Sequence, residues 1–324
     1  DNINSESRMA IGAGFGCFLN DTGEMVIVNL DNDKTINLDV GFCCKYPVIM
    51  KNKIFIANDQ IITISDKNGE VIDILIPEGN ISSIKATSDY VYYITENKKI
   101  FIYSFNSPEK MYILEEISDQ IITELVVLDN YIVVSTESDV YVYLEHETNI
   151  VFSKKFTHKE LINVIGIKNI LFVVEKNCIT RYDIFRETSK TYIALTEFDD
   201  KKIIINSETS IVVALHNKVF IIDFKHQEPV PDKICELKNQ EIITDFINCD
   251  GDFVIIINDS QLGIIRKENE YKVTSQFEFN NSENSLLSSG YGNLFITSKK
   301  RIYQITHHLK EEVEVMEDGE EDVA

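Results

Sequence analysis

The stretch YVYYITENKKIFIYSF (residues 90–105) joins two apolar runs through the polar turn Glu96–Lys99. Both runs are rich in aromatic and β-branched residues, which fit the pleated surface of a sheet. Two such runs around a short polar turn predict a β-hairpin. Seven more stretches repeat this pattern: GFGCFLNDTGEMVIVNL from Gly14, KIFIANDQIITIS from Lys53, YIVVSTESDVYVYLE from Tyr131, ILFVVEKNCITRYDIF from Ile170, SIVVALHNKVFIIDF from Ser210, FVIIINDSQLGIIRK from Phe253 and NLFITSKKRIYQI from Asn293.

The hairpins recur at a nearly constant spacing. Their second strands open at Met25, Ile61, Ile100, Val140, Ile179, Val219, Leu262 and Ile302, and subtraction gives successive differences of 36, 39, 40, 39, 40, 43 and 40. Two further short apolar runs lie between hairpins, for example Glu70–Ile76 followed by Ile81–Thr87, so each period holds four strands. Four strands in about 40 residues are typical of a propeller blade, whereas helical repeats would show apolar residues at 3.6-residue spacing.

We therefore predict an all-β fold, a single β-propeller of four-stranded blades over residues 1–310. The repeat count favours eight blades. Seven would result if the first or last unit is incomplete, or if strands from both chain ends share one blade. Runs such as Phe253–Ile257 are apolar at every position, as expected of strands whose two faces are both covered by neighbouring blades.

Ile81–Phe105 resembles a unit of the WD-repeat propellers in its order of strand, turn, strand, sharp turn and strand. The chain departs from that family because it contains no Trp, so the Trp-Asp pair is absent. Tyr103, Tyr143 and the pair Tyr182-Asp183 stand near the positions where Trp-Asp would fall. The resemblance implies a propeller architecture and carries no functional residues across.

Ala10–Val28 and Ser289–Ile305 are similar to repeats of the regulator of chromosome condensation. Those repeats are longer and richer in Gly, and only two of the eight units share their appearance. This second resemblance implies an alternative function, guanine-nucleotide exchange on a small GTPase.

The net charge of −22 indicates which classes of partner the chain could bind. Nucleic-acid backbones are bound by Lys and Arg, so direct nucleic-acid binding is disfavoured. A basic protein partner is favoured, although an acidic surface also serves solubility. No run of apolar residues is long enough to span a bilayer, so we expect no membrane span.

An acidic tail, residues 311–324, follows the predicted propeller. A block of like charge repels itself and often serves as an interaction tail. Its first half could instead add a strand to the last blade. The candidate partner-binding residues in the tail are Glu311, Glu312, Glu314, Glu317, Asp318, Glu320, Glu321 and Asp322.

No motif points to catalysis, a cofactor or a metal. The run Gly12–Gly16 has the form GxGxG but precedes a strand, so we read it as a tight backbone turn and not as a phosphate loop. Asp66–Glu70 begins like a calcium loop, yet position 77 is Pro where the bidentate Glu should stand, so we predict a hairpin turn. Surface or loop positions are expected for the six histidines: His146, His158, His216, His226, His307 and His308.

The pattern of cysteines indicates in which cellular compartment the protein is expected. Reduced, mostly buried thiols in a cytoplasmic or nuclear protein are expected, since no CxxC spacing occurs among Cys17, Cys43, Cys44, Cys178, Cys235 and Cys249. Four sequons leave secretion as an alternative: Asn20, Asn80, Asn258 and Asn280. We expect a non-catalytic scaffold that mediates protein–protein interactions within a larger assembly, with nucleotide exchange as the alternative.

Overall fold

The structure is a computed structural model. It describes residues 9–306 apart from 20–23, 31, 33, 40–44, 59, 106–110, 113, 115–116, 118–119, 147–148, 194–201, 227, 239, 250–251, 259, 268–270, 279–285, 291–292 and 298–301. Side-chain surroundings are described as far as Arg266. None of the described residues forms a helix that is long and apolar enough to cross a membrane.

Within the described residues the strands form eight antiparallel sheets, seven with four strands and one with three. We number these sheets as blades 1 to 8 in chain order. Blades 1 to 4 consist of β1 (Met9–Gly12), β2 (Phe15–Leu19), β3 (Glu24–Asn29), β4 (Thr35–Asp39); β5 (Lys45–Met50), β6 (Lys53–Ala57), β7 (Ile62–Asp66), β8 (Val71–Leu75); β9 (Ile81–Ala86), β10 (Tyr90–Thr95), β11 (Ile100–Ser104), β12 (Met111–Tyr112); β13 (Glu124–Val127), β14 (Tyr131–Ser135), β15 (Asp139–Glu145) and β16 (Ile150–Thr157). Blades 5 to 8 consist of β17 (Leu161–Ile167), β18 (Ile170–Glu175), β19 (Cys178–Asp183), β20 (Thr188–Ile193); β21 (Lys202–Ser207), β22 (Ser210–Leu215), β23 (Lys218–Asp223), β24 (Pro231–Glu236); β25 (Ile243–Cys249), β26 (Asp252–Ile257), β27 (Gln261–Lys267), β28 (Tyr271–Glu278); β29 (Leu286–Gly290), β30 (Asn293–Thr297) and β31 (Ile302–Thr306).

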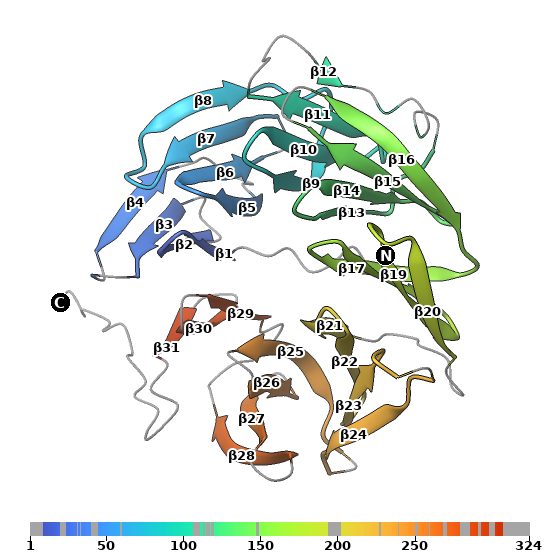
Figure 1. Cartoon of the computed structure of the whole chain (residues 1–324). Helices are drawn as coiled ribbons and strands as arrows, with labels where there is room; N and C mark the ends of the chain where they lie inside the picture. Colours follow the sequence, from blue (N-terminus) through green and yellow to red (C-terminus); the bar gives the residue numbers. More distant parts are fainter. Residues whose placement is uncertain are drawn as a thin grey trace, which may run out of the picture.

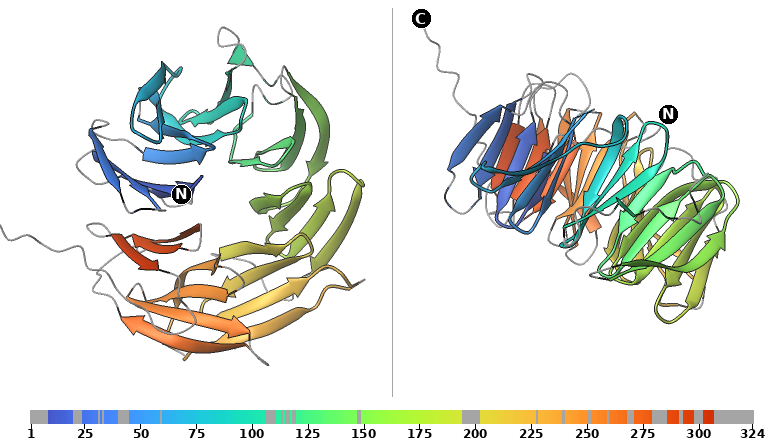
Figure 2. Two further views of the ribbon diagram at one scale, coloured as in Figure 1. Left: turned by 60° about the vertical axis from the view of Figure 1, so that its left-hand side comes forward. Right: turned by 90° about the horizontal axis from the view of Figure 1, so that it is seen from above.

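The blades form a closed ring, a β-propeller (Figures 1 and 2). The first strand of each blade contacts the first strand of the next, in the order β1, β5, β9, β13, β17, β21, β25 and β29, and β29 contacts β1. Each predicted hairpin forms the second and third strands of one blade. The predicted all-β propeller fold is therefore confirmed. In the described part of the chain, β1 shares its sheet with β2, β3 and β4, and β29, β30 and β31 form a separate sheet.

The hydrophobic core lies between blades. Six core clusters in the described part of the chain each combine residues from two successive blades, from blades 1 and 2 through to blades 6 and 7. In β22, Ile211 and Val213 pack with blade 5, whereas Val212 and Ala214 pack with blade 7. Successive side chains of a strand point to opposite faces. Both faces are covered, which is why the runs are apolar at every position, as predicted.

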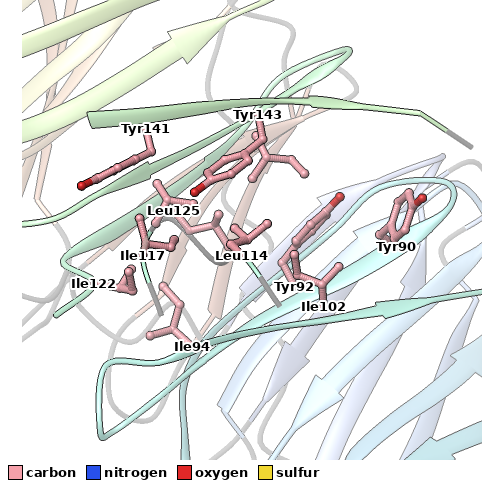
Figure 3. Close-up of a cluster of buried hydrophobic side chains, with 12 residues drawn as sticks. Tyr90, Tyr92, Ile94, Ile102, Leu114, Ile117, Ile122, Leu125, Tyr141 and Tyr143 are labelled. Atoms are coloured by element: carbon pink, nitrogen blue, oxygen red, sulfur yellow. The ribbon is translucent and has the colours of Figure 1, made fainter. Parts of the chain in front are cut away.

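The junction of blades 3 and 4 is rich in tyrosine (Figure 3). The Tyr90 hydroxyl donates to the carbonyl oxygen of His146 at 2.7 Å, and the Tyr92 hydroxyl donates to the Glu145 carboxylate. Both rings are fully buried, and their centroids are 6.0 Å apart. These two hydroxyls thus find acceptors at the end of β15, so Tyr90 and Tyr92 bury their rings without losing hydrogen bonds.

One backbone hydrogen bond recurs from blade to blade. The amide that follows or ends the third strand donates to a carbonyl just before the second strand: Leu30 to Gly14 at 3.0 Å, Phe105 to Asp89, Glu145 to Asn130 and Ile184 to Asn169 at 2.9 Å, and Phe224 to Thr209 at 2.7 Å. A backbone bond depends little on side-chain identity. The blades therefore repeat one geometry even though their side-chain motifs are degenerate.

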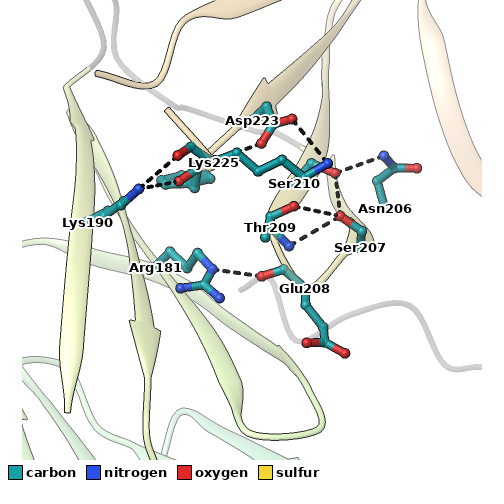
Figure 4. A network of polar contacts seen from close by, with 10 residues as sticks. Arg181, Lys190, Asn206, Ser207, Glu208, Thr209, Ser210, Asp223 and Lys225 are labelled. Carbon is teal, nitrogen blue, oxygen red and sulfur yellow. Dashed lines mark hydrogen bonds and ion pairs between the residues drawn. The ribbon is translucent and has the colours of Figure 1, made fainter. Parts of the chain in front are cut away.

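Two lysines on outer strands reach across to the next blade. Lys190 of β20 donates to the carbonyl oxygens of Phe224, Lys225 and His226 at 2.9, 3.1 and 3.2 Å (Figure 4). An ammonium group carries three donors, so one side chain can satisfy all three carbonyls of the loop that leaves β23.

Lys154 of β16 makes the equivalent contact one blade earlier. It donates to the carbonyl oxygen of Ile184 at 3.1 Å and to the carboxylate of Glu187 at 2.8 Å. In the sheet register Lys154 lies opposite Val142 and Lys190 lies opposite Arg181, so the two lysines occupy equivalent positions in blades 4 and 5. These inter-blade lysine contacts tie blade 4 to blade 5 and blade 5 to blade 6.

Replacing Lys190 with Met is expected to lower the free energy of unfolding by about 1–2 kcal/mol, because hydrogen bonds to a charged donor are lost while the apolar stem is kept. Urea denaturation followed by circular dichroism measures this change. Lys67→Met, in the exposed turn after β7, is the matched control and should change stability by less than about 0.5 kcal/mol. Equal effects of the two substitutions would contradict the structural role of Lys190.

Candidate interaction surface

The acidic residues predicted to bind a partner, from Glu311 to Asp322, lie outside the described residues. The same holds for the alternative in which the tail adds a strand to blade 8. Both stay predictions.

Most of the described cysteines are buried, as expected, and His146, His216 and His226 lie in turns or loops with at least partly exposed side chains. Cys17, Cys178 and Cys235 are free, and the first and third of these are buried. His158 differs, because it is buried although it lies in the connection between β16 and β17. The side chains of Cys43, Cys44, Cys249, His307 and His308 lie outside the described set.

His158, Glu175 and Cys178 meet in one cluster between blades 4 and 5. Glu175 accepts from the Cys178 thiol at 2.9 Å, and its other oxygen lies 3.4 Å from His158 Nδ1. Burial and the nearby carboxylate raise the pKa of Cys178 to about 12, so this thiol remains protonated and is a weak nucleophile. Among the described side chains, no group of three His, Cys, Asp or Glu could hold a metal ion.

Two motifs from the sequence form turns. Ala13 and Gly14, with φ of 51° and 81°, make the turn of the β1–β2 hairpin, so the GxGxG run is a tight backbone turn, as predicted. In the β7–β8 hairpin, Asp66 Oδ1 accepts from the amides of Asn68 at 2.8 Å and Glu70 at 2.9 Å. These bonds lower the pKa of Asp66 and confirm the predicted hairpin turn.

The β7–β8 turn also depends on Gly69. Its φ of +82° lies in the left-handed region, and a Cβ atom there would lie 2.8 Å from a Leu38 methyl group of blade 1. A side chain there would strain the backbone and would require Leu38 to shift, so glycine suits this turn, which leads into β8.

Strand β8 is the most exposed apolar element that the structure describes. Val71, Ile72 and Ile74 are 59%, 54% and 53% exposed, and Ile76, which follows the strand, is 83% exposed. β8 is the outermost strand of blade 2 and, among the described residues, pairs on one side only, with β7 (Figure 1). An outer edge leaves backbone donors and acceptors available, and contiguous exposed apolar side chains mark interaction sites.

Other outer strands carry charge where β8 carries apolar side chains. β16 contains Lys154 and Lys155, β20 contains Lys190, and β24 contains Asp232 and Lys233. Lysine on an edge strand discourages pairing with another chain, and natural sheets use it widely for this purpose. β8, like β4 and β12, has no lysine, and its one charged residue is Asp73.

Two half-buried aromatic residues of blade 3, Tyr103 and Phe105, lie beside β8. The Tyr103 hydroxyl donates to Asp73 Oδ2 across the blade boundary at 3.4 Å, and its ring packs edge-on against Phe105 at 5.9 Å. Lys53 Nζ lies 4.1 Å from the centre of the Phe105 ring. The apolar side chains of β8 thus lie next to one carboxylate, Asp73 of the same strand, and two aromatic rings of blade 3. We call β8, Ile76, Tyr103 and Phe105 the β8 surface.

Sequence reasoning identified Glu70–Ile76 as a strand and missed its exposure. Apolar residues of this strand occur on both of its faces, and in the central strands the same pattern reflects burial on both faces. A strand at the outside of a blade has no neighbour to cover it. Only the position of β8 at the end of its sheet distinguishes it from a central strand.

No protein-family model matches the chain, and no curated protein sequence matches it. Solved structures resemble it closely in fold. The computationally designed protein Ika8 matches with a TM-score of 0.69 at 11% identity, over 91% of this chain and 94% of its own. BamB from Moraxella catarrhalis matches with 0.68 at 9% identity, over 91% and 94%. The dihydro-heme d1 dehydrogenase NirN matches with 0.71 at 10% identity, over 97% and 75%. These neighbours share the propeller architecture, and at such low identity the likeness shows the fold alone.

Proposed function

We propose that this protein is a non-catalytic propeller scaffold that binds protein partners at the β8 surface within a larger assembly. The observation that carries the proposal is the exposed, lysine-free apolar edge of blade 2. Interaction surfaces are typically apolar at their centre and polar at the rim, which matches isoleucines beside Asp73 and Tyr103.

Charge and chemistry support the same proposal. A net charge of −22 favours a basic partner through electrostatic steering. The cluster of His158, Glu175 and Cys178 holds a protonated thiol, which does not suit nucleophilic catalysis. Free thiols at Cys17, Cys178 and Cys235 are consistent with work in the cytoplasm or nucleus.

The test begins with affinity purification of the tagged protein from its own cells at low and moderate salt. Three forms are compared: the full chain, a chain ending at Lys310, and the double variant Ile72→Lys, Ile74→Lys. The most enriched protein is then purified and its Kd for each form is measured by calorimetry.

We expect direct binding that weakens at least tenfold in the double variant, because two lysines replace apolar contact area at an edge. Binding that depends only on residues after Lys310 would move the site to the acidic tail. No direct partner for any form would contradict the scaffold function.

A further inference from the structure

We propose that the partner binds by strand addition: an extended segment pairs with β8 as a fifth strand of blade 2 and places a Lys or Arg opposite Asp73. This inference rests on the proposed function and specifies how the β8 surface is used. Strand addition combines backbone hydrogen bonds for affinity with alternate side chains for specificity.

The backbone of β8 defines the length of the added strand. The strand runs from Val71 to Leu75, after the Gly69 turn. Its register with β7 shifts between Val71 and Asp73, so Asp73–Leu75 is the regular part of the edge, and Pro77 ends the extended segment because it lacks an amide donor. The Ile74 amide donates to Asp73 Oδ1 at 2.8 Å. A partner that attracts the Asp73 carboxylate releases this amide for the incoming strand.

Charge selects the occupant. Asp73 is the central residue of β8, and both of its oxygens meet neutral donors, the Ile74 amide and the Tyr103 hydroxyl. Within the described part of the chain, Asp73 has no ion pair with Lys or Arg. A cation on the added strand therefore gains a carboxylate partner, and opposite charges directly across a strand pair stabilise it.

The negative charge of Asp73 disfavours a second copy of this chain as the strand that pairs with β8. A two-fold pairing of β8 with itself is antiparallel and, centred on the strand, places Asp73 opposite Asp73. Like charges directly opposite each other are destabilising, and each copy carries a net charge of −22. The chain's own acidic tail after Lys310 has the same disadvantage.

The experiment uses the purified full chain and a phage-displayed library of ten-residue peptides. Selected peptides are synthesised, and their Kd values are measured by fluorescence anisotropy against the native protein, Ile72→Lys plus Ile74→Lys, and Asp73→Lys. Asp232→Lys on β24 is the matched control, an exposed aspartate on another outer strand. Thermal melting checks that each variant is folded.

We expect enriched peptides with alternating apolar residues around one Lys or Arg. N-methylation of alternate peptide amides should weaken binding at least tenfold for one parity of positions and little for the other, because only one parity faces β8. Asp73→Lys should weaken the basic peptide about fivefold and strengthen its Glu analogue, as expected for an opposed charge pair. Asp232→Lys should do neither.

Each failure has a separate meaning. Selected peptides that lose binding in the β8 variant but tolerate N-methylation at every position would overturn strand addition and leave the docking surface in place. Peptides without a cation, unaffected by Asp73→Lys, would overturn the charge assignment. A dimer in light scattering that Ile72→Lys plus Ile74→Lys abolishes would replace the partner by a second copy. Peptides and cellular partner that both bind the β8 variant unchanged would overturn the proposed function itself.

Discussion

Replacing Tyr92 with Ala is expected to lower the free energy of unfolding by about 3–5 kcal/mol, the largest effect of any substitution considered for this protein. Tyr92 is fully buried between blades 3 and 4 (Figure 3), and its hydroxyl donates to the Glu145 carboxylate. Alanine leaves a cavity at the junction and removes the donor from a carboxyl group whose pKa is already raised by burial. Urea denaturation monitored by tyrosine fluorescence and circular dichroism measures the loss.

Two further variants separate the causes. Tyr92→Phe keeps the ring and removes the hydroxyl, so it should cost only about 1–3 kcal/mol, the usual cost of an unsatisfied partner. Phe185→Ala removes an aromatic ring that is 76% exposed and should cost less than about 0.5 kcal/mol. A Tyr92→Ala variant as stable as Phe185→Ala would show that the junction of blades 3 and 4 is not packed as described.

Replacing Glu124 with Gln is expected to stabilise the protein above neutral pH. Glu124 of β13 accepts from the amide of Val164 in β17 at 3.2 Å, so it connects the inner strands of blades 4 and 5. Burial raises its pKa to about 7, although the Val164 amide and the charge of Lys85 act in the opposite direction.

The sign follows from proton linkage. In the unfolded chain a Glu has a pKa of about 4.3, so the folded state binds this proton more tightly. The stability gained from the bound proton is present below this pKa and is lost as the pH rises to the folded pKa of about 7. Gln does not titrate and keeps an oxygen that can accept from Val164. The advantage of Glu124→Gln over the native protein should therefore grow by about 2 kcal/mol between pH 5.5 and pH 8.

Urea midpoints at the two pH values measure this difference. Glu137→Gln, in the exposed β14–β15 turn, is the control and should show no comparable change between pH 5.5 and pH 8. If the difference between Glu124→Gln and the native protein were the same at both pH values, Glu124 would not be the group that titrates.

Features local to one hairpin could be predicted from the sequence. The two strands around Glu96–Lys99 and the Asp66–Glu70 turn each depend on a few neighbouring residues, and both form as expected. The continuous apolar runs also indicated burial on both faces. In β22 this is realised by alternate residues packing with different blades.

Features that depend on contacts between blades could not be predicted. His158 resembles any loop histidine in the sequence, yet Tyr182 of blade 5 covers it with ring centroids 5.9 Å apart. Glu124 is one of 53 acidic residues, and only the proximity of β13 to β17 makes it a buried carboxyl group. Nothing in the local sequence distinguishes these positions.

By itself, the sequence determined the repeat, the four strands of each unit and the all-β propeller, because these follow from local alternation and a spacing near 40 residues. Tertiary structure alone decided which apolar strand is left uncovered. β8 and the central strand β10 are both mostly apolar, but β10 has a strand on each side and a blade on each face, whereas β8 ends its sheet. Burial is a property of position in the assembled ring, so the candidate interaction surface emerged only when the blades were in place.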